Sequence, residues 1–329
     1  MTERRIARGP YFEELTHGQV FASSPAVTLT GGLAAAHQAI VGNRLKLVLD
    51  ERLAETVTGE GPLASPGLVW DVAIGQSTAA TQNVRANLFY RGLVFSRFPH
   101  IGDTLSTTTT VERLRQNRGR EGRPPTGLAV LRITTTDQLG RMVLDFWRCA
   151  MLPLGAPGVE TGHSDDLEEV GVPAADRALT SALTGWQLAR GPAAECAQEL
   201  AVGTSWEVAG GDVVSSAPEL ARLTMNLAAV HHDVRAAGGR RLVYGGHTIG
   251  IALGQLTRAL PDLLTIVGWH SCDHVGPVHE GDTLRSVVSL EGIQPLDGSA
   301  SLAHLRVQVT ADGDPDRPVL DWRPIAVLP

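Results

Sequence analysis

Apolar and polar positions along the chain follow two different periods, which predict a mixture of long strands and buried helices. The runs at 104–114, 127–137 and 142–152 have alternating or β-branched character, a pattern typical of half-buried strands. The stretches at 70–84 and 245–260 are rich in small and apolar residues around most of a helical circumference, so each predicts a buried helix. A buried helix followed by several antiparallel strands indicates an α+β fold in which a sheet wraps round a helix.

Three segments of the first half of the chain recur in the second half in the same order. The spacing between matched segments changes only slowly along the chain, as small insertions and deletions would produce. Collinear matches of this kind indicate two copies of one fold. The matched pairs are Tyr11–Phe21 with Cys196–Trp206, Pro99–Leu114 with Pro277–Gly292, and Val143–Pro153 with Val319–Pro329.

The duplication predicts two domains joined by a linker. Residues 1–153 form the first predicted domain and residues 196–329 the second, and each opens with a predicted helix, at 30–42 and at 217–231. The intervening residues 154–195 are rich in Gly, Pro, Ala and acidic side chains, which is typical of a linker with at most one short helix. We therefore expect a pseudo-dimer within one chain.

Composition and charge exclude several classes of protein. The 329 residues, with 43% hydrophobic and 19% charged side chains, have the composition of a soluble globular protein. A net charge of −7 leaves no basic excess to neutralise phosphates, so we expect no nucleic-acid partner. No apolar run reaches the ~20 residues of a membrane span, and the amino terminus lacks the apolar core of a secretory signal. Three widely spaced cysteines do not indicate a disulfide framework, so we expect a cytoplasmic location.

The segment "NLAAVHHDVRAAGGRRLVYGGHTIG" (Asn226–Gly250) contains the candidate chemistry. A histidine pair is followed by a basic pair and then by Gly-Gly-His at the start of a predicted buried helix. The residue types alone are compatible with an acid–base centre and an oxyanion site, with a metal site, or with a polar loop. An imidazole can take and return a proton near neutral pH, and backbone N–H groups at a helix amino terminus can stabilise an oxyanion.

Together with "YFEEL", "NLFYRGLVF" and "TGLAVLR", this segment resembles the MaoC-like double hot-dog hydratases, and within them the mesaconyl-CoA hydratase (β-methylmalyl-CoA dehydratase) group. The resemblance covers almost the whole chain and is most specific at 226–247. It implies a double hot-dog fold, in which each of two tandem units wraps an antiparallel sheet round a central helix. It also implies a hydro-lyase that reversibly adds water to an enoyl-CoA thioester, with no cofactor other than the coenzyme A of the substrate.

The family motif Asp-x-Asn-Pro-x-His, with the His-Gly pair that follows it, can be transferred onto this chain residue by residue. Aligning the motif histidine with His231 makes this imidazole the implied catalytic base and Gly246 the implied oxyanion amide. The motif aspartate corresponds to Asn226, which cannot take a proton and is expected to orient water or substrate by hydrogen bonds. This departure leaves His231 as base alone, or with a carboxylate that the sequence does not identify.

Residues flanking the implied catalytic groups are expected to bind the substrate. Two arginines ahead of the helix, or the basic loop at 113–123, are candidates for the coenzyme A phosphates, although a solvated loop explains the latter equally well. The predicted substrate-binding residues are Tyr244, Gly245, His247, Arg240 and Arg241.

The first copy lacks the full set of residues that the family motif requires. His37 stands at the matching place, but Gly32 replaces the asparagine and "LVWDVAIG" lacks the Gly-Gly pair. We therefore expect a degenerate first domain that shapes the acyl-CoA tunnel. His270, Cys272 and His274 alternate along a predicted strand, but their spacing matches no zinc motif, so we expect no metal.

Other interpretations remain open at this stage. A related hydratase or dehydratase could act on another short or polyketide-type acyl thioester. A hot-dog thioesterase usually depends on a carboxylate base, and Asn226 weakens that interpretation. A non-catalytic acyl-CoA-binding protein would have no need of both His231 and Gly246. We also expect a homodimer, since single-chain double hot-dog proteins often pair.

Overall fold

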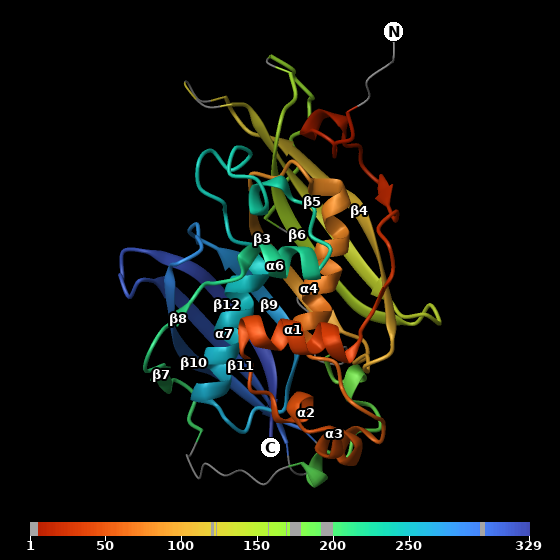
Figure 1. Cartoon of the computed structure of the whole chain (residues 1–329), viewed down its shortest axis with the longest axis vertical. Helices are drawn as coiled ribbons and strands as arrows, with labels where there is room; N and C mark the ends of the chain where they lie inside the picture. Colours follow the sequence, from red (N-terminus) through yellow and green to blue (C-terminus); the bar gives the residue numbers. More distant parts are fainter. Residues whose placement is uncertain are drawn as a thin grey trace.

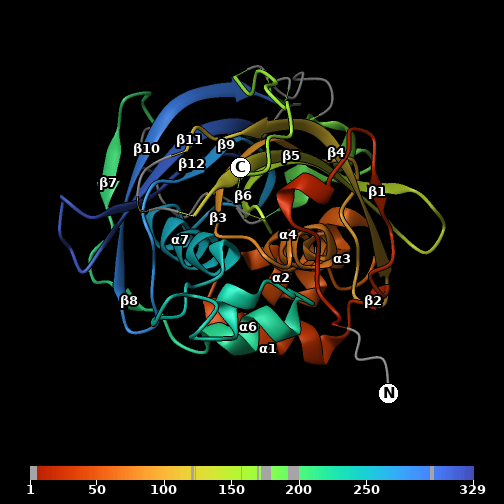
Figure 2. The same cartoon turned by 90° about the horizontal axis from the view of Figure 1, so that it is seen from above.

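The computed structural model of the protein describes residues 6–119, 122, 124–156, 158–168, 170–171, 179–191, 200–296 and 300–329. Within these residues, twelve strands form one antiparallel sheet that curves over two buried helices, α4 (Pro66–Gln76) and α7 (Gly245–Ala259). Figure 2 shows α1 (Gly31–Val41) and α6 (Ala217–Leu223) on the side of α4 and α7 that faces away from the sheet. The fold is therefore a curved sheet wrapped round two central helices, as the sequence predicts.

Each half of the chain supplies one run of strands to the sheet. The strands are β1 (Val20–Phe21), β2 (Val27–Thr28), β3 (Ala86–Phe95), β4 (Thr104–Gln116), β5 (Thr126–Thr136), β6 (Met142–Pro153), β7 (Ser205–Glu207), β8 (Asp212–Val213), β9 (Thr265–His274), β10 (Thr283–Pro295), β11 (Ser301–Ala311) and β12 (Pro318–Leu328). Their order is β1-β4-β5-β6-β3-β9-β12-β11-β10-β7, with β2 paired to β4 and β8 paired to β10. Because β3 pairs with β9, the two halves share one continuous sheet (Figure 1).

Helix α7 matches the buried helix predicted at 245–260, whereas α4 begins four residues before the helix predicted at 70–84 and ends at Gln76, where a short 3-10 turn follows. Every residue of α4 is buried, and α7 is buried from Gly246 to Thr257. Pro66 begins α4 in the first helical turn, where its missing N–H costs no hydrogen bond. The other helices are α2 (Lys46–Leu49) and α3 (Glu51–Thr58), with short 3-10 turns η1 (Phe12–Glu14), η2 (Ser77–Thr81), η3 (Ser181–Leu183), η4 (Leu188–Arg190) and η5 (Ala229–His231).

Glycines allow the helices to approach each other at backbone distance. A Cβ atom on Gly75 would lie 1.6 Å from the carbonyl oxygen of Thr224, so the end of α4 touches the backbone that follows α6. On α7, a Cβ on Gly250 would lie 2.6 Å from Cγ1 of Val41, and one on Gly254 would lie 3.0 Å from the Val41 carbonyl oxygen. The small residues that make these helices look apolar in the sequence therefore serve close packing.

An aromatic cluster fills the core where the two halves meet. Trp70 of α4 packs edge-to-face on Trp269 of β9, with ring centroids 4.9 Å apart, and on Trp322 of β12, at 6.2 Å. Tyr90 of β3 adds a further edge-to-face contact with Trp269 at 5.8 Å. All four side chains are almost completely buried, so their packing stabilises the contact between α4 and the strands of the second half.

The structure confirms the α+β double hot-dog prediction and corrects one predicted helix. The stretch at 217–231 does not form a continuous helix, because α6 ends at Leu223 and Met225 adopts a left-handed φ of 64°. The side-chain oxygen of Asn226 then accepts a hydrogen bond from the backbone N–H of Ala228, which competes with helix formation. The chain resumes as the short turn η5, which ends at His231.

Part of the predicted linker lies outside the described residues. In the linker these are residues 157, 169, 172–178 and 192–195, and residues 196–199, with which the second domain is predicted to begin, are not described either. The division into 1–153, 154–195 and 196–329 therefore stays a prediction. In the parts of the chain that the structure does cover, no helix has the length and apolar character needed to cross a bilayer.

Replacing Gly75 with alanine should destabilise the protein, because the new Cβ would overlap the Thr224 carbonyl group and neither backbone can move freely. We expect the free energy of unfolding, measured with urea, to fall by at least ~2 kcal/mol. Gly31→Ala is the matched control, since that exposed helical glycine has open space around it and should change stability by less than ~0.5 kcal/mol. Equal stability of the two variants would contradict a close contact between Gly75 of α4 and the Thr224 carbonyl group.

Candidate active site

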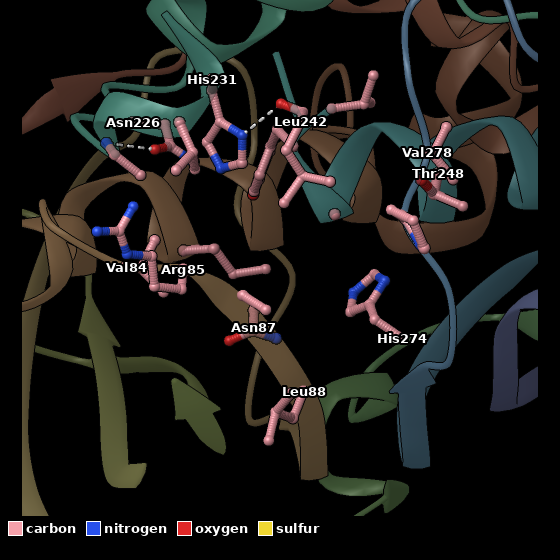
Figure 3. A pocket seen from close by; sticks show the side chains of 18 of the residues that line it. Val84, Arg85, Asn87, Leu88, Asn226, His231, Leu242, Thr248, His274 and Val278 are labelled. Atoms are coloured by element: carbon pink, nitrogen blue, oxygen red, sulfur yellow. Dashed lines mark hydrogen bonds between the residues drawn. The ribbon is translucent and has the colours of Figure 1, made fainter. Parts of the chain in front are cut away.

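A cavity of about 300 Å³ lies where β3 and β6 of the first half face η5 and the amino-terminal end of α7 (Figure 3). This volume is typical of a small-molecule site. Both halves line the cavity, and no Asp or Glu is among its described lining residues. The polar residues that line it are Thr78, Arg85, Asn87, Tyr90, Arg148, Asn226, His231, Tyr244, Thr248 and His274.

His231 presents an unprotonated ring nitrogen to this cavity. Its Nδ1 lies 2.8 Å from the carbonyl oxygen of Leu242, and because a carbonyl oxygen only accepts, Nδ1 must carry the proton. In the neutral ring the free lone pair is then on Nε2, which Figure 3 shows on the open side of the ring. Burial lowers the pKa of His231 to about 4, although the Leu242 hydrogen bond opposes this shift. The imidazole is therefore neutral at pH 7 and can accept a proton.

The first half of the chain holds the segment that carries His231. The N–H of Leu227 donates to Oγ1 of Thr78 at 2.8 Å, and the N–H of Ala229 donates to the carbonyl oxygen of Gln82 at 3.0 Å. Thr78 lies in η2 and Gln82 directly follows it. The position of His231 thus depends on hydrogen bonds between the two halves.

Asn226 supplies a hydrogen-bond donor to the same cavity. The side chain is 3% exposed, its Oδ1 accepts from the Ala228 N–H at 2.9 Å, and its backbone oxygen accepts from Nε2 of His232 at 2.7 Å. Its Nδ2 forms no hydrogen bond with any described residue. The amide NH₂ group is therefore available to a water or ligand in the cavity, which suits the orienting role expected from the sequence.

The first two residues of α7 are glycines, and neighbouring side chains occupy the space that a Cβ atom would need. A Cβ on Gly245 would lie 2.6 Å from Nε2 of His274, and one on Gly246 would lie 2.1 Å from Oδ1 of Asp71. The N-cap residue Tyr244 makes no side-chain hydrogen bond to the helix, and the N–H groups of the two glycines form no hydrogen bond within the described chain. Gly245 lines the cavity, whereas Gly246, the implied oxyanion amide, follows it on the helix and is not among the lining residues. Unpaired amides and the helix dipole together make this end favourable for negative charge.

A buried carboxyl group supports the site from behind. Asp71 pairs through Oδ2 with Nε2 of His37 at 2.9 Å, and its Oδ1 accepts a hydrogen bond from the Tyr244 hydroxyl at 3.1 Å. All three side chains are at most 2% exposed, and burial raises the pKa of Asp71. The Tyr244 ring lies 5.8 Å from the ring of His231. The carboxyl group therefore acts on the site through Tyr244 and does not line the cavity itself.

Three of the residues predicted to bind substrate do not line the cavity. His247 is fully buried, and neither of its ring nitrogens has a hydrogen-bond partner. Arg240 pairs with Asp282 at 3.2 Å, and Arg241 pairs with Glu280 at 3.3 Å. The two arginines are thus engaged with carboxylates away from the cavity, whereas Tyr244 and Gly245 do line it.

Several cavity residues were missed by sequence reasoning. Arg148 lies in "DFWRCAML", where an isolated charge at an inward position of a strand was the available signal. Asn87 had no comparable signal. His274 was considered only with His270 and Cys272 as a possible metal group, and among the described residues no three His, Cys, Asp or Glu side chains are arranged to hold a metal.

Lowering the pH should destabilise the protein through its buried histidines. The pKa of His247 is lowered by burial to about 4, whereas an unfolded histidine titrates near 6.5. Between these values the unfolded chain binds more protons, so the free energy of unfolding should fall as pH decreases from about 6.5 to about 4, by at most ~3 kcal/mol for this residue. We expect His247→Met to reduce this fall in urea titrations at several pH values. An unchanged pH dependence would contradict a lowered pKa.

Comparisons with known proteins agree with this architecture. No family model matches the chain. The solved structure of RV0216 from Mycobacterium tuberculosis, described as a double hotdog fold, is 53% identical, with a TM-score of 0.87 over 97% of this chain and 98% of that one. The β-methylmalyl-CoA dehydratase of Chloroflexus aurantiacus is 28% identical over 324 residues, 95% of this chain and 90% of the relative. The mesaconyl-CoA hydratase of Cereibacter sphaeroides is 27% identical over 292 residues, 84% and 82% of the two chains. The chain belongs to the double hot-dog family that includes RV0216, and it is similar over most of its length to two hydro-lyases named for CoA thioesters.

Proposed function

We propose that the protein catalyses the reversible hydration of an enoyl-CoA thioester, with mesaconyl-CoA as the unsaturated form and β-methylmalyl-CoA as the hydrated form. The names of the two curated relatives support this substrate pair. The observation that carries the proposal is the hydrogen bond from Nδ1 of His231 to Leu242, since it leaves a basic nitrogen facing the cavity.

In the proposed reaction, Nε2 of His231 removes a proton from water as the water oxygen bonds to the β-carbon of the substrate. The electron pair of the double bond moves toward the thioester carbonyl, which becomes an enolate oxygen. The N–H of Gly246, with that of Gly245, donates to this oxygen at the amino terminus of α7. His231 then returns the proton to the α-carbon, so that one water has been added. Asn226 orients the attacking water through Nδ2.

We assign the coenzyme A portion to a second cavity of about 650 Å³, which shares Arg85 and Leu88 with the first. Asn117 and Arg118 from the start of the basic loop also line this cavity. Arg85 and Arg118 are exposed, and neither forms an ion pair with a described carboxylate, so both can bind phosphate groups. They are better suited to this role than the paired arginines ahead of α7.

A thioesterase function receives less support. Hot-dog thioesterases usually depend on a carboxylate base, and none is found among the described residues of the cavity lining. The proposed hydration needs no cofactor beyond the coenzyme A of the substrate. A homodimer and a cytoplasmic location stay predictions, and the buried, unbonded thiols of Cys149 and Cys272 are compatible with a reducing compartment.

Removing the imidazole should abolish most of the activity. We expect His231→Ala to lower kcat for mesaconyl-CoA hydration by roughly 10²- to 10⁴-fold, because general base catalysis is lost. The measurement follows the enoyl-thioester absorbance. Asp233→Ala is the control, since this neighbouring side chain is exposed and should leave the rate within about twofold. Retained activity in the His231 variant, or release of free thiol by the wild-type protein, would contradict the proposal.

The pH dependence of the rate should also follow the protonation state of His231. Since burial lowers the pKa of His231 to about 4, the base stays neutral down to mildly acidic pH. We expect kcat/KM to be nearly constant between about pH 8 and about pH 5 and to fall as pH approaches about 4, where the ring becomes protonated. Circular dichroism at each pH controls for unfolding. A fall in kcat/KM near pH 6.5 would instead mean that the pKa of His231 is not lowered in the free enzyme.

A further inference from the structure

Arg148 is a buried cation inside the proposed reaction cavity. It lies on β6, opposite Tyr90 of β3, and is only 3% exposed. Its Nη2 donates to Oγ1 of Thr81 at 2.5 Å and to the carbonyl oxygen of Ser77 at 3.3 Å. These two bonds, both to the η2 segment, fix one end of the guanidinium group and leave the other end to the cavity.

No acidic side chain neutralises this guanidinium. Among the described residues, no carboxylate forms an ion pair with Arg148, and its Nε is buried without a hydrogen-bond partner. Its Nη1 forms no hydrogen bond with any residue that the structure describes. A buried charge without a counter-ion is energetically costly, and an arginine remains protonated even so. The cavity lining therefore includes a positive charge with no acidic partner among the described residues.

The surroundings of Arg148 fit a bound carboxylate. Asn87, which lines the same cavity, has neither its Oδ1 nor its Nδ2 hydrogen-bonded, although both atoms are buried. The charge of Arg148 is one of the influences that lower the pKa of His231, so the two side chains are close enough to interact. At the matching position in the second half, β12 carries Pro324 and no charge. Only the half that faces His231 therefore has the cation.

We propose that Arg148 binds a carboxylate on the acyl group of the substrate and so makes the enzyme selective for dicarboxylic acyl thioesters. Nη1, which forms no hydrogen bond with a described residue, can donate to an oxygen of this carboxylate, and the charge of the guanidinium strengthens that bond. The amide of Asn87 supplies an additional donor to the same group. This inference rests on the proposed hydratase function and adds to it the residue that selects the acyl chain.

The other arginines near the site are less suited to this role. Arg240 and Arg241 are already paired with carboxylates outside the cavity. Arg85 is exposed, and its Nη1 donates to the Ala236 carbonyl oxygen at 3.3 Å. Arg148 alone combines a position in the lining, near-complete burial and no acidic partner among the described residues.

The test compares two substrates that differ at the far end of the acyl chain. Mesaconyl-CoA has a free carboxylate at that end, and crotonyl-CoA has a methyl group in its place. For Arg148→Gln we expect kcat/KM to fall roughly 100-fold or more with mesaconyl-CoA and less than about fivefold with crotonyl-CoA. Arg148→Lys keeps the charge and should retain part of the preference. Arg132→Gln is the control, because this arginine lies on neighbouring β5 and pairs with Asp145 at the surface.

Equal losses with both substrates would overturn the proposal, since they would indicate a general structural role. A wild-type enzyme that prefers crotonyl-CoA would overturn it as well. Calorimetric binding of succinyl-CoA and butyryl-CoA keeps the proposal testable if the wild type hydrates neither enoyl thioester. We then expect wild type, but not Arg148→Gln, to bind succinyl-CoA at least about tenfold more tightly than butyryl-CoA. That result would reject the hydratase function and support carboxylate recognition by Arg148. Equal affinities of the wild type for succinyl-CoA and butyryl-CoA would reject carboxylate recognition.

Discussion

The antiparallel pairing of β3 with β9 is the contact on which the rest of the structure depends. It aligns Phe89 with Asp273 and Val94 with Gly268, and the strands approach so closely that a Cβ on Gly268 would lie 2.4 Å from the Leu93 carbonyl oxygen. This pairing joins two sheets into one and brings strands of the first half to face helix α7 of the second. The cavity exists only because of that junction, since each half supplies groups that the other lacks.

Sequence reasoning could predict what local pattern and the duplication determine. Strand periods, the apolar helix at 245–260 and the motif around His231 all relate residues close together in the chain, and the structure does bring Asn226, His231 and Gly245 to one cavity. The contribution of the first half could not be found this way. Arg148 and Asn87 reach the cavity through strand pairing, which no local signal describes.

Proximity in the sequence was also misleading at two positions. Arg240 and Arg241 stand just ahead of the catalytic helix, but acidic residues that come some forty positions later hold them outside the cavity. The break in the predicted helix at 217–231 had a local cause, because the Asn226 side chain binds backbone at Ala228. A single short polar residue thereby replaces a helical turn with the geometry that presents His231.

The absence of carboxylates from the described cavity lining gives Asn226 a second significance. An aspartate at 226 would introduce an internal anion, which would repel an anionic acyl group and compete with it for the positive field of Arg148. An asparagine keeps the hydrogen-bond donor and removes the charge. The departure from the family motif and the uncompensated arginine are thus two parts of one electrostatic arrangement.

The pairing of Asp71 with His37 and Tyr244 links the histidine of the first copy to the cavity residues of the second. His37 stands where the motif of the second half has His231, and Asp71 is the sixth residue of α4, as Gly250 is the sixth residue of α7. The carboxyl group pairs with a histidine of the first half and accepts a hydrogen bond from Tyr244 of the second half at the same time. Replacing Asp71 with glycine, the residue at the corresponding place in α7, would remove the partner of both His37 and Tyr244, so the two copies are not interchangeable at this position.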